Sequence, residues 1–299
     1  MYDLIILGGG PAGLTATVYA LRKRLNVLLI TRDLGGKTNY HLQLPFVEKH
    51  LVITGAEVVS RFANEIEYLE FSRVFDKAEK VQKTKAGFKV ATRDGGEYES
   101  KALIVATGAL GRLLKIPGEK EYMMRGLCYS AVSYAPLFIE RNVVVIGDTQ
   151  LALRSAAELA HIAREVTVVA PTHGELDSPL GRNVLKAENV QVMEGYRVDE
   201  VKGDEYARRI LVSKNGDTTE LEADAFFVEL ELDPQSEIVA GMVARDERNR
   251  IMIDGRNRTS TEGLFAAGDV TDIIAEQVLI SVGEGAKAAL SAYEYLLQL

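Results

Sequence analysis

The feature that most constrains this chain is a glycine-rich turn between an apolar strand and a helix. Residues 4–7 are Leu-Ile-Ile-Leu, residues 8–13 are Gly-Gly-Gly-Pro-Ala-Gly, and a helical pattern follows through residue 23. A dinucleotide-binding turn needs a glycine for the tight turn, a second where the backbone meets a pyrophosphate, and a third for helix–strand packing. Gly8, Gly10 and Gly13 meet these needs, so the sequence predicts one dinucleotide site here.

The same arrangement recurs at residues 143–161, but its turn is altered. The strand Val-Val-Val-Ile at 143–146 leads into Gly147-Asp148-Thr149-Gln150-Leu151-Ala152. Thr149 stands where the second glycine belongs, and Asp148 puts a carboxylate where an anionic pyrophosphate would meet the helix. Asp and Thr are both good N-caps, so we expect this helix to cap itself without a ligand. The second site is therefore disfavoured.

The rest of the chain predicts an α/β fold with two Rossmann-like dinucleotide-binding domains, the second inserted into the first. We expect the first domain at residues 1–113 and 246–299, and the inserted one at 114–245. Turn signals at Asp94-Gly95-Gly96 and Asn215-Gly216-Asp217 predict two hairpins. Residues 101–107, with the apolar run Ala-Leu-Ile-Val-Ala at 102–106, predict a separate buried strand.

Composition excludes several classes of function. The 299 residues carry a net charge of −8, which disfavours a broad nucleic-acid surface. No apolar run approaches the roughly 20 residues that span a bilayer, and the N-terminus has no leader pattern, so we expect a cytoplasmic protein without membrane contact. Cys128 is the one cysteine, which rules out an intrachain disulfide, and the four histidines show no ligand-like spacing, so no metal site is expected.

Five ordered motifs give the chain a resemblance to the low-molecular-weight thioredoxin reductase family, which includes the flavoprotein subunit of alkyl hydroperoxide reductases. They are Gly8–Gly13, Gly35-Gly36, Ala106-Thr107-Gly108, residues 265–270 (Phe-Ala-Ala-Gly-Asp-Val) and residues 282–289. The resemblance covers almost the whole chain. It implies bound FAD and a homodimer.

The expected FAD contacts come from these motifs and their neighbours. The pyrophosphate is expected at Gly10, where backbone N–H groups and the helix dipole favour an anion. Asp269 is expected to accept hydrogen bonds from the ribityl chain, to cap the last helix, or to do both. Either Thr31 or Asp33 would grip the adenosine ribose, and position favours Thr31. The expected cofactor-binding residues are Gly8, Gly10, Pro11, Ala12, Gly13, Thr31, Gly36, Lys37, Ala106, Thr107, Gly108, Gly268, Asp269, Gln277 and Val278.

Three departures from the family pattern alter the expected chemistry. Ser130 and Ser133 replace the redox cysteines, so no disulfide can form there, and we expect Cys128 to be a small buried hydrophobe. Residues 170–175, after the strand that follows the second turn, contain no arginine to bind the 2′-phosphate of NADPH. Bulky and acidic residues at 228–234 fill a step that is small in relatives. No catalytic residue is assigned.

These observations leave three functions open. The first is an FAD-dependent oxidoreductase that does not use NAD(P)H at the usual site, with electrons from a ferredoxin-like protein, a thiol or a second ligand. The second is an NAD(P)H-dependent flavin reductase of the ferredoxin–NADP reductase type, which also lacks the disulfide. The third is a non-enzymatic flavin-binding sensor or interaction protein, with Arg22-Lys23-Arg24 and Arg112 as a docking patch.

Overall fold

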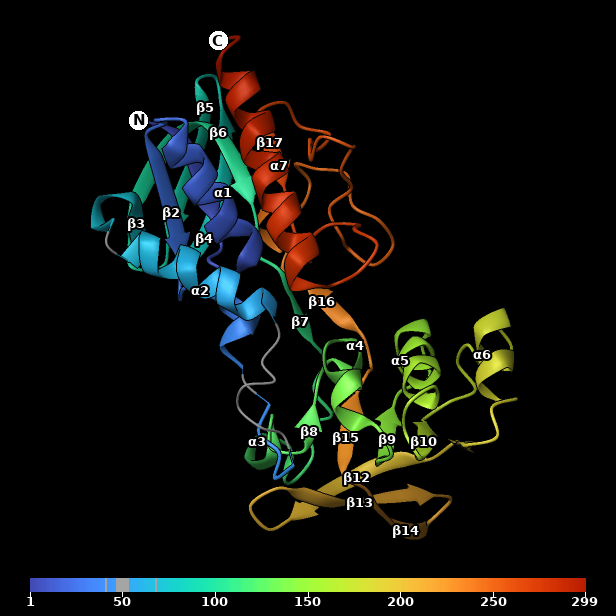
Figure 1. Ribbon diagram of the computed structural model, residues 1–299. Coiled ribbons are helices and arrows are strands. Elements are labelled where there is room, and N and C mark those ends of the chain that lie inside the picture. Colours follow the sequence, from blue (N-terminus) through green and yellow to red (C-terminus); the bar gives the residue numbers. More distant parts are fainter. Residues whose placement is uncertain (41, 47–53, 68) are drawn as a thin grey trace. The chain divides into compact units, whose positions relative to one another are not determined.

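The computed structural model describes residues 1–40, 42–46, 54–67 and 69–299, without the side chains of residues 54–56, 71, 132 and 133. The chain divides into two compact units. Unit 1 comprises residues 1–39, 52–110 and 233–299, and unit 2 comprises residues 40–51 and 111–232. Figure 1 labels most of the helices and strands of both units.

Unit 1 is built on a sheet with the strand order β3-β2-β1-β6-β5-β4, and β17 pairs with β6. Strands β1, β2, β3, β6 and β17 pair in parallel, whereas β4, β5 and β6 form antiparallel hairpins. The elements of unit 1 are β1 (Tyr2–Leu7), α1 (Pro11–Arg22), β2 (Val27–Thr31), η1 (Gly36–Asn39), α2 (Thr54–Glu67), η2 (Glu70–Ser72), β3 (Arg73–Phe75), β4 (Ala78–Thr84), β5 (Gly87–Thr92), β6 (Glu97–Val105), η4 (Glu237–Val239), β17 (Leu264–Ala266) and α7 (Val278–Leu296).

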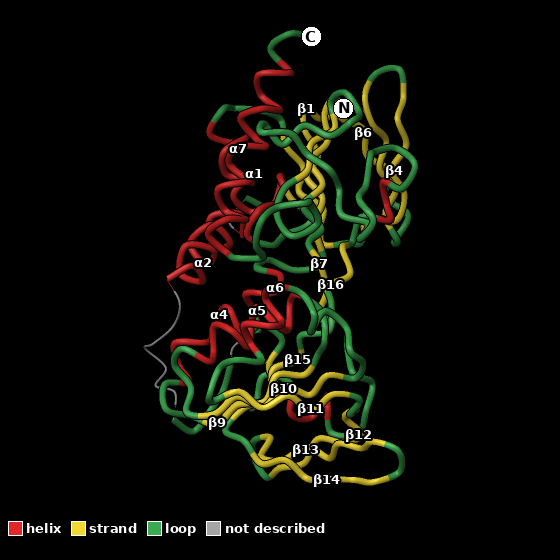
Figure 2. The backbone as a smooth tube through the Cα atoms, turned by 90° about the vertical axis from the view of Figure 1, so that its right-hand side faces the viewer, coloured by secondary structure: helices red, strands yellow, loops and turns green. Residues whose placement is uncertain are grey.

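Alternate residues of β1 enter two different cores. Leu4 and Ile6 pack with α1, α2 and α7, while Ile5 and Leu7 pack with β5 and the η4 region on the other face. A strand buried on both faces reads as a continuous apolar run, which explains the pattern at residues 4–7. Figure 2 shows α1 and α7 side by side on one face of this sheet.

The hairpin predicted at Asp94-Gly95-Gly96 is confirmed, but the two strands expected after it are one. β6 runs without a break from Glu97 to Val105. Its first half pairs antiparallel with β5, and from Ser100 onward it pairs in parallel with β1. The polar first half and the apolar second half therefore reflect a change of neighbours within one strand.

Unit 2 contains a parallel sheet with the order β11-β10-β9-β15-β8 and a separate antiparallel sheet β12-β13-β14. Its elements are α3 (Glu119–Tyr122), β8 (Leu127–Cys128), α4 (Ala131–Tyr134), η3 (Ala135–Phe138), β9 (Asn142–Ile146), α5 (Gln150–Ala160), β10 (Glu165–Ala170), α6 (Pro179–Val184), β11 (Val190–Glu194), β12 (Arg197–Gly203), β13 (Ala207–Lys214), β14 (Asp217–Glu222) and β15 (Ala225–Val228). Asn215 and Gly216 both have positive φ, as a tight two-residue hairpin between β13 and β14 requires.

The chain passes between the units at other positions than the sequence predicts. It enters unit 2 after Leu110 and leaves it at Asp233, through the paired strands β7 (Ala109–Gly111) and β16 (Leu232–Pro234). Residues 233–245, expected in the inserted domain, contribute Val239 and Val243 to the core of unit 1. Residues 42–46 belong to unit 2, where Leu44 lies in the same buried hydrophobic cluster as Phe138. Burial against distant residues decides these boundaries, and local composition does not report it.

No helix in the described part of the chain is long and apolar enough to cross a membrane.

Candidate functional site

The first glycine turn has the geometry of a phosphate-binding turn. Gly8 has φ +105°, and a Cβ built there would lie 2.3 Å from the carbonyl oxygen of Ala106. A Cβ on Gly13 would lie 1.8 Å from the carbonyl oxygen of Gly8. Gly10 differs, since a Cβ there would meet no atom within 4 Å. Two glycines are thus required by close packing, while the third borders open space.

Helix α1 presents its first N–H groups to that open space. Gly10 is its N-cap residue and Pro11 its first residue, no side chain caps it, and its first turn holds no acidic residue. The orphan N–H groups and the positive end of the helix dipole together favour an anion. The turn can therefore accept a pyrophosphate over Gly10.

Segments distant in sequence converge on this turn from the carboxyl ends of β6 and β17. Ala106 lies against Gly8, and a Cβ on Gly268 would lie 3.0 Å from the Cβ of Ala12. A Cβ on Gly36 would lie 3.1 Å from the Cα of Gly10. Ligands of open parallel sheets bind at this edge of the strands. The structure thus brings together most of the residues that the sequence selects for FAD.

Asp269 forms a small polar cluster beside the turn. The ammonium of Lys37 lies 2.5 Å from Asp269 Oδ2, and the hydroxyl of Ser281 donates to Asp269 Oδ1 over 3.2 Å. The Asp269 side chain is only 11% exposed. The N-cap of α7 is Gln277, and no side chain caps that helix, so Asp269 does not serve as its cap. Of the two expected functions of Asp269, accepting hydrogen bonds from a ribityl chain therefore stays a prediction.

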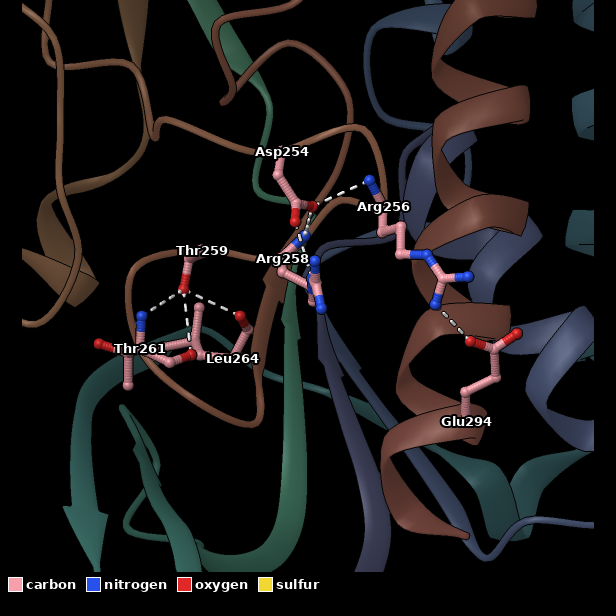
Figure 3. A network of polar contacts seen from close by, with 7 residues as sticks. All are labelled: Asp254, Arg256, Arg258, Thr259, Thr261, Leu264 and Glu294. Carbon is pink, nitrogen blue, oxygen red and sulfur yellow. Dashed lines mark hydrogen bonds and ion pairs between the residues drawn. The ribbon is translucent and has the colours of Figure 1, made fainter. Parts of the chain in front are cut away.

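Side-chain hydrogen bonds hold the loop that precedes β17. Gly268 and Asp269 follow shortly after this strand, so the loop helps to position them. Figure 3 shows that Asp254 accepts backbone N–H bonds from Arg256 and Arg258 and pairs with the Arg258 guanidinium. Arg256 pairs with Glu294 of α7 at 2.7 Å. Thr259 bonds back to the carbonyl oxygen of Leu264 at the start of β17. These contacts tie β17 to α7.

The remaining expected contacts lie around the same edge. The Thr31 hydroxyl is buried and donates to the carbonyl oxygen of Asp33, whose carboxylate accepts from the Gly36 N–H. The Thr107 hydroxyl donates to the Gln235 carbonyl oxygen, and Gly108 has φ +70° beside open space.

The expected contacts at the start of α7 differ in exposure. Gln277 is exposed, whereas Val278 packs against the hydrophobic core around α1. Ser281 is a site residue that the sequence did not predict. The one feature that marks it in the sequence is a hydroxyl on the face of α7 that is buried.

The second glycine turn is closed by its own side chains. Asp148 Oδ2 accepts a 2.8 Å bond from the Thr172 N–H and a 2.6 Å bond from the Thr172 hydroxyl. A Cβ on Gly174 would lie 2.2 Å from the Asp148 carbonyl oxygen. The turn is thus joined directly to the loop after β10, where a dinucleotide would place its adenosine ribose.

Thr149 makes a second bridge on the other side of the turn. Strand order reverses between β9 and β15, and a dinucleotide lies in the crevice at such a switch point. The Thr149 hydroxyl crosses that crevice and donates to the Leu230 carbonyl oxygen over 3.1 Å. Thr149 is the N-cap residue of α5, but no side chain caps the helix. The prediction that this helix caps itself is therefore wrong, because both side chains bond to distant loops.

The acidic segment after β15 contributes a third contact. Glu229 is 2% exposed, and its carboxylate accepts a 2.6 Å bond from the Ala131 N–H at the start of α4. Glu231 is at the surface, where it pairs with Arg112. Of the three acids in this segment, Glu229 is buried, whereas Glu231 and Asp233 are at the surface.

The segment from Cys128 to Tyr134, where the resemblance led us to expect two redox cysteines, contains one cysteine, and it is not exposed. Cys128 is fully buried, and burial together with the charge of Glu229 raises its pKa. The expectation of a small buried hydrophobe is confirmed. Ser130 is the N-cap residue of α4, and the side chain of Ser133 lies outside the described residues. No group of three potential metal ligands occurs among the described residues.

His173 follows Thr172 in the loop that closes the second turn. Its Nε2 lies 3.0 Å from Asp177, and its Nδ1 lies 3.0 Å from Glu194. The hydrogen bonds to Asp177 and then Glu194 raise the pKa of His173. The position after β10 is thus occupied by an imidazole held between two acids rather than by an arginine.

The chain is similar to known proteins over almost its whole length. The model of the pyridine nucleotide-disulphide oxidoreductase family matches residues 2–289. An alkyl hydroperoxide reductase subunit of Staphylococcus aureus is 33% identical over 304 residues, covering 99% of this chain and 59% of the relative, and its counterpart of Pseudomonas aeruginosa is 34% identical, covering 99% and 58%. The crystal structure of thioredoxin reductase from Streptococcus pyogenes superposes with a TM-score of 0.89 at 29% identity, covering 100% of this chain and 99% of that one. This chain therefore belongs to the pyridine nucleotide-disulphide oxidoreductase family.

Proposed function

We propose that this chain is an FAD-dependent oxidoreductase, similar to thioredoxin reductase, whose electrons come from a donor other than NAD(P)H at the usual site. Family membership and the thioredoxin reductase neighbours imply FAD. The chain spans about three fifths of the curated relatives it matches, so their complete activity is not transferred to it. Bound FAD would supply the electron-transfer chemistry, and the protein residues would bind and orient it.

The residues of unit 1 fit FAD. The open space over Gly10 and the uncapped N-terminus of α1 suit the pyrophosphate. The shielded carboxylate of Asp269 suits ribityl hydroxyls, and Lys37 beside it offsets part of the negative charge. Thr31 or Asp33 would hold the adenosine ribose, and the buried Thr31 hydroxyl can still accept a bond there.

The observation that carries the proposal is the pair of side-chain bridges from the second turn. Asp148 bonds to Thr172, and Thr149 bonds to Leu230, so bridges span both sides of the place where NAD(P)H would bind. Binding would have to break both bridges and bring a pyrophosphate next to the Asp148 carboxylate. Like charges at close range disfavour this.

The proposal also rests on the missing disulfide. Ser130 and Ser133 cannot cycle between dithiol and disulfide, and the single cysteine is buried. Electrons would therefore pass between the flavin and a ferredoxin-like protein, a small thiol or a ligand of the second unit. A cytoplasmic homodimer is part of this proposal, and gel filtration with light scattering tests the dimer.

One observation favours a second candidate, an NAD(P)H-dependent flavin reductase of the ferredoxin–NADP reductase type. The first N–H groups of α5 are not capped by any side chain. An unfilled helix N-terminus retains some attraction for a phosphate. This candidate requires the loops of Thr172 and Leu230 to move away from the turn.

Anaerobic titration of the FAD-loaded protein, first with NADH and then with NADPH, separates the two candidates. We expect the visible absorbance of the flavin to persist at stoichiometric nucleotide and to bleach on addition of dithionite. Rapid bleaching by either nucleotide would refute the proposal and establish the reductase. Lack of bleaching by dithionite would show instead that the preparation itself is defective, and the titration would be repeated after reconstitution with fresh FAD.

A further inference from the structure

We infer that Lys37 raises the reduction potential of the bound flavin by holding a positive charge beside Asp269. This inference deepens the proposed function, since it relies on FAD binding at the first turn. Among the donors that it names, a small thiol is the one that a higher flavin potential would favour.

The position of Lys37 is fixed by its backbone and by its ion pair. It lies in η1 directly after Gly36, where an added Cβ would lie 3.1 Å from the Cα of Gly10. Its ammonium extends to Asp269 Oδ2 at 2.5 Å. Lys37 therefore reaches from the pyrophosphate turn to the carboxylate proposed for the ribityl chain, which connects the pyrophosphate to the flavin ring.

The two charges of this pair have unequal surroundings. The Asp269 side chain is 11% exposed, while that of Lys37 is 43% exposed. Without Lys37, the shielded carboxylate of Asp269 would have no cation beside it at the position proposed for the ribityl chain. Reduction at neutral pH adds two electrons and one proton to the flavin, which leaves one extra negative charge on it. A nearby negative charge opposes that change and a positive charge assists it.

The test is to measure the ratio of reduced to oxidised flavin against a reference dye. Xanthine and xanthine oxidase deliver the electrons slowly under anaerobic conditions, with methyl viologen as mediator. In Lys37→Gln we expect this ratio to fall about ten-fold at a fixed dye potential, equivalent to about 30 mV for a two-electron couple. Lys37→Arg should keep the parent ratio, because it retains the charge.

A lysine elsewhere in unit 1 provides a matched control. Lys101 is 46% exposed and pairs with Asp3 at 2.7 Å, near the amino end of β1 rather than its carboxyl end. Lys101→Gln therefore removes a similar ion pair away from the proposed site and should leave the ratio unchanged. If Lys37→Gln does not retain FAD, Asp269→Asn keeps Lys37 and should move the ratio in the opposite direction.

Three results would overturn the inference: a ratio in Lys37→Gln within two-fold of the parent, an equal fall in Lys37→Arg, or a fall in Asp269→Asn. The measurement uses no pyridine nucleotide. Reduction of the protein by NADH would refute the proposed electron source without altering this result, so the two failures are distinguishable.

Discussion

The open space over Gly10 leads to a prediction that separates folding from FAD binding. Gly10 has φ −75° and ψ −175°, a conformation that alanine adopts without strain, and an added Cβ would meet no atom within 4 Å. Gly10→Ala should therefore fold. Its methyl group would point into the space proposed for the pyrophosphate, so FAD binding should weaken.

The magnitudes of the two effects follow from the local geometry. Replacing a glycine by alanine in a compatible conformation stabilises a protein by about 0.4–1 kcal/mol through the unfolded chain. The methyl would displace a pyrophosphate oxygen from at least one N–H group, and a hydrogen bond to a charged group contributes about 1.5–3 kcal/mol. At about 1.4 kcal/mol per factor of ten, the dissociation constant for FAD should rise about ten- to a hundred-fold.

The assay is quenching of FAD fluorescence on titration with apoprotein, together with the thermal midpoint of the apoprotein. Gly283→Ala is the matched control, since Gly283 is exposed on α7 and a Cβ there also meets no atom within 4 Å. It should stabilise the apoprotein by about 1 kcal/mol and leave FAD affinity unchanged. Unchanged FAD affinity in Gly10→Ala would refute the reasoning, because the pyrophosphate could not then lie over this turn.

Three further predictions concern unit 2. Asp148→Gly combined with Thr149→Gly removes both bridges across the second turn and should strengthen NADH binding at least about ten-fold by calorimetry, since each bridge is worth about 1 kcal/mol; unchanged binding would show that the bridges are not the obstacle. The raised pKa of His173 means that its acid pairs stabilise the fold fully below the unfolded pKa of 6.5 and are lost as pH rises through the folded pKa. The difference in thermal midpoint between the parent and His173→Gln should therefore be largest in acid and vanish in alkali, and a pH-independent difference would contradict this. Cys128 should react with a thiol reagent only after denaturant is added, because burial raises its pKa; rapid labelling of the native protein would contradict its burial.

Much of unit 1 could be predicted from local sequence. Only glycine fits at Gly8 and Gly13, because a backbone oxygen lies where the Cβ of any other residue would be. That requirement is local to the turn, so the motif predicts both the turn and the helix that follows. The motifs around Ala106 and Gly268 then predict which strand ends approach it.

The partners of polar side chains could not be predicted in the same way. Asp148 and Thr149 are good N-caps by residue type, yet Asp148 bonds to Thr172, 24 residues away, and Thr149 to Leu230, 81 residues away. Each side chain can bond either to the nearby helix N–H groups or to a donor or acceptor that the fold places close to it. Only the assembled sheet, with β9 between β10 and β15, determines that choice.

The sequence by itself determined the fold class and the first glycine turn, because both follow from residue types at fixed local spacing, and its single cysteine rules out an intrachain disulfide within the 299 residues. The tertiary structure alone decided that Glu229 is buried against α4, that Lys37 pairs with Asp269, and that residues 42–46 belong to unit 2. These facts depend on long-range burial and on charge pairs between distant segments. Such interactions have no periodicity along the chain from which they could be predicted.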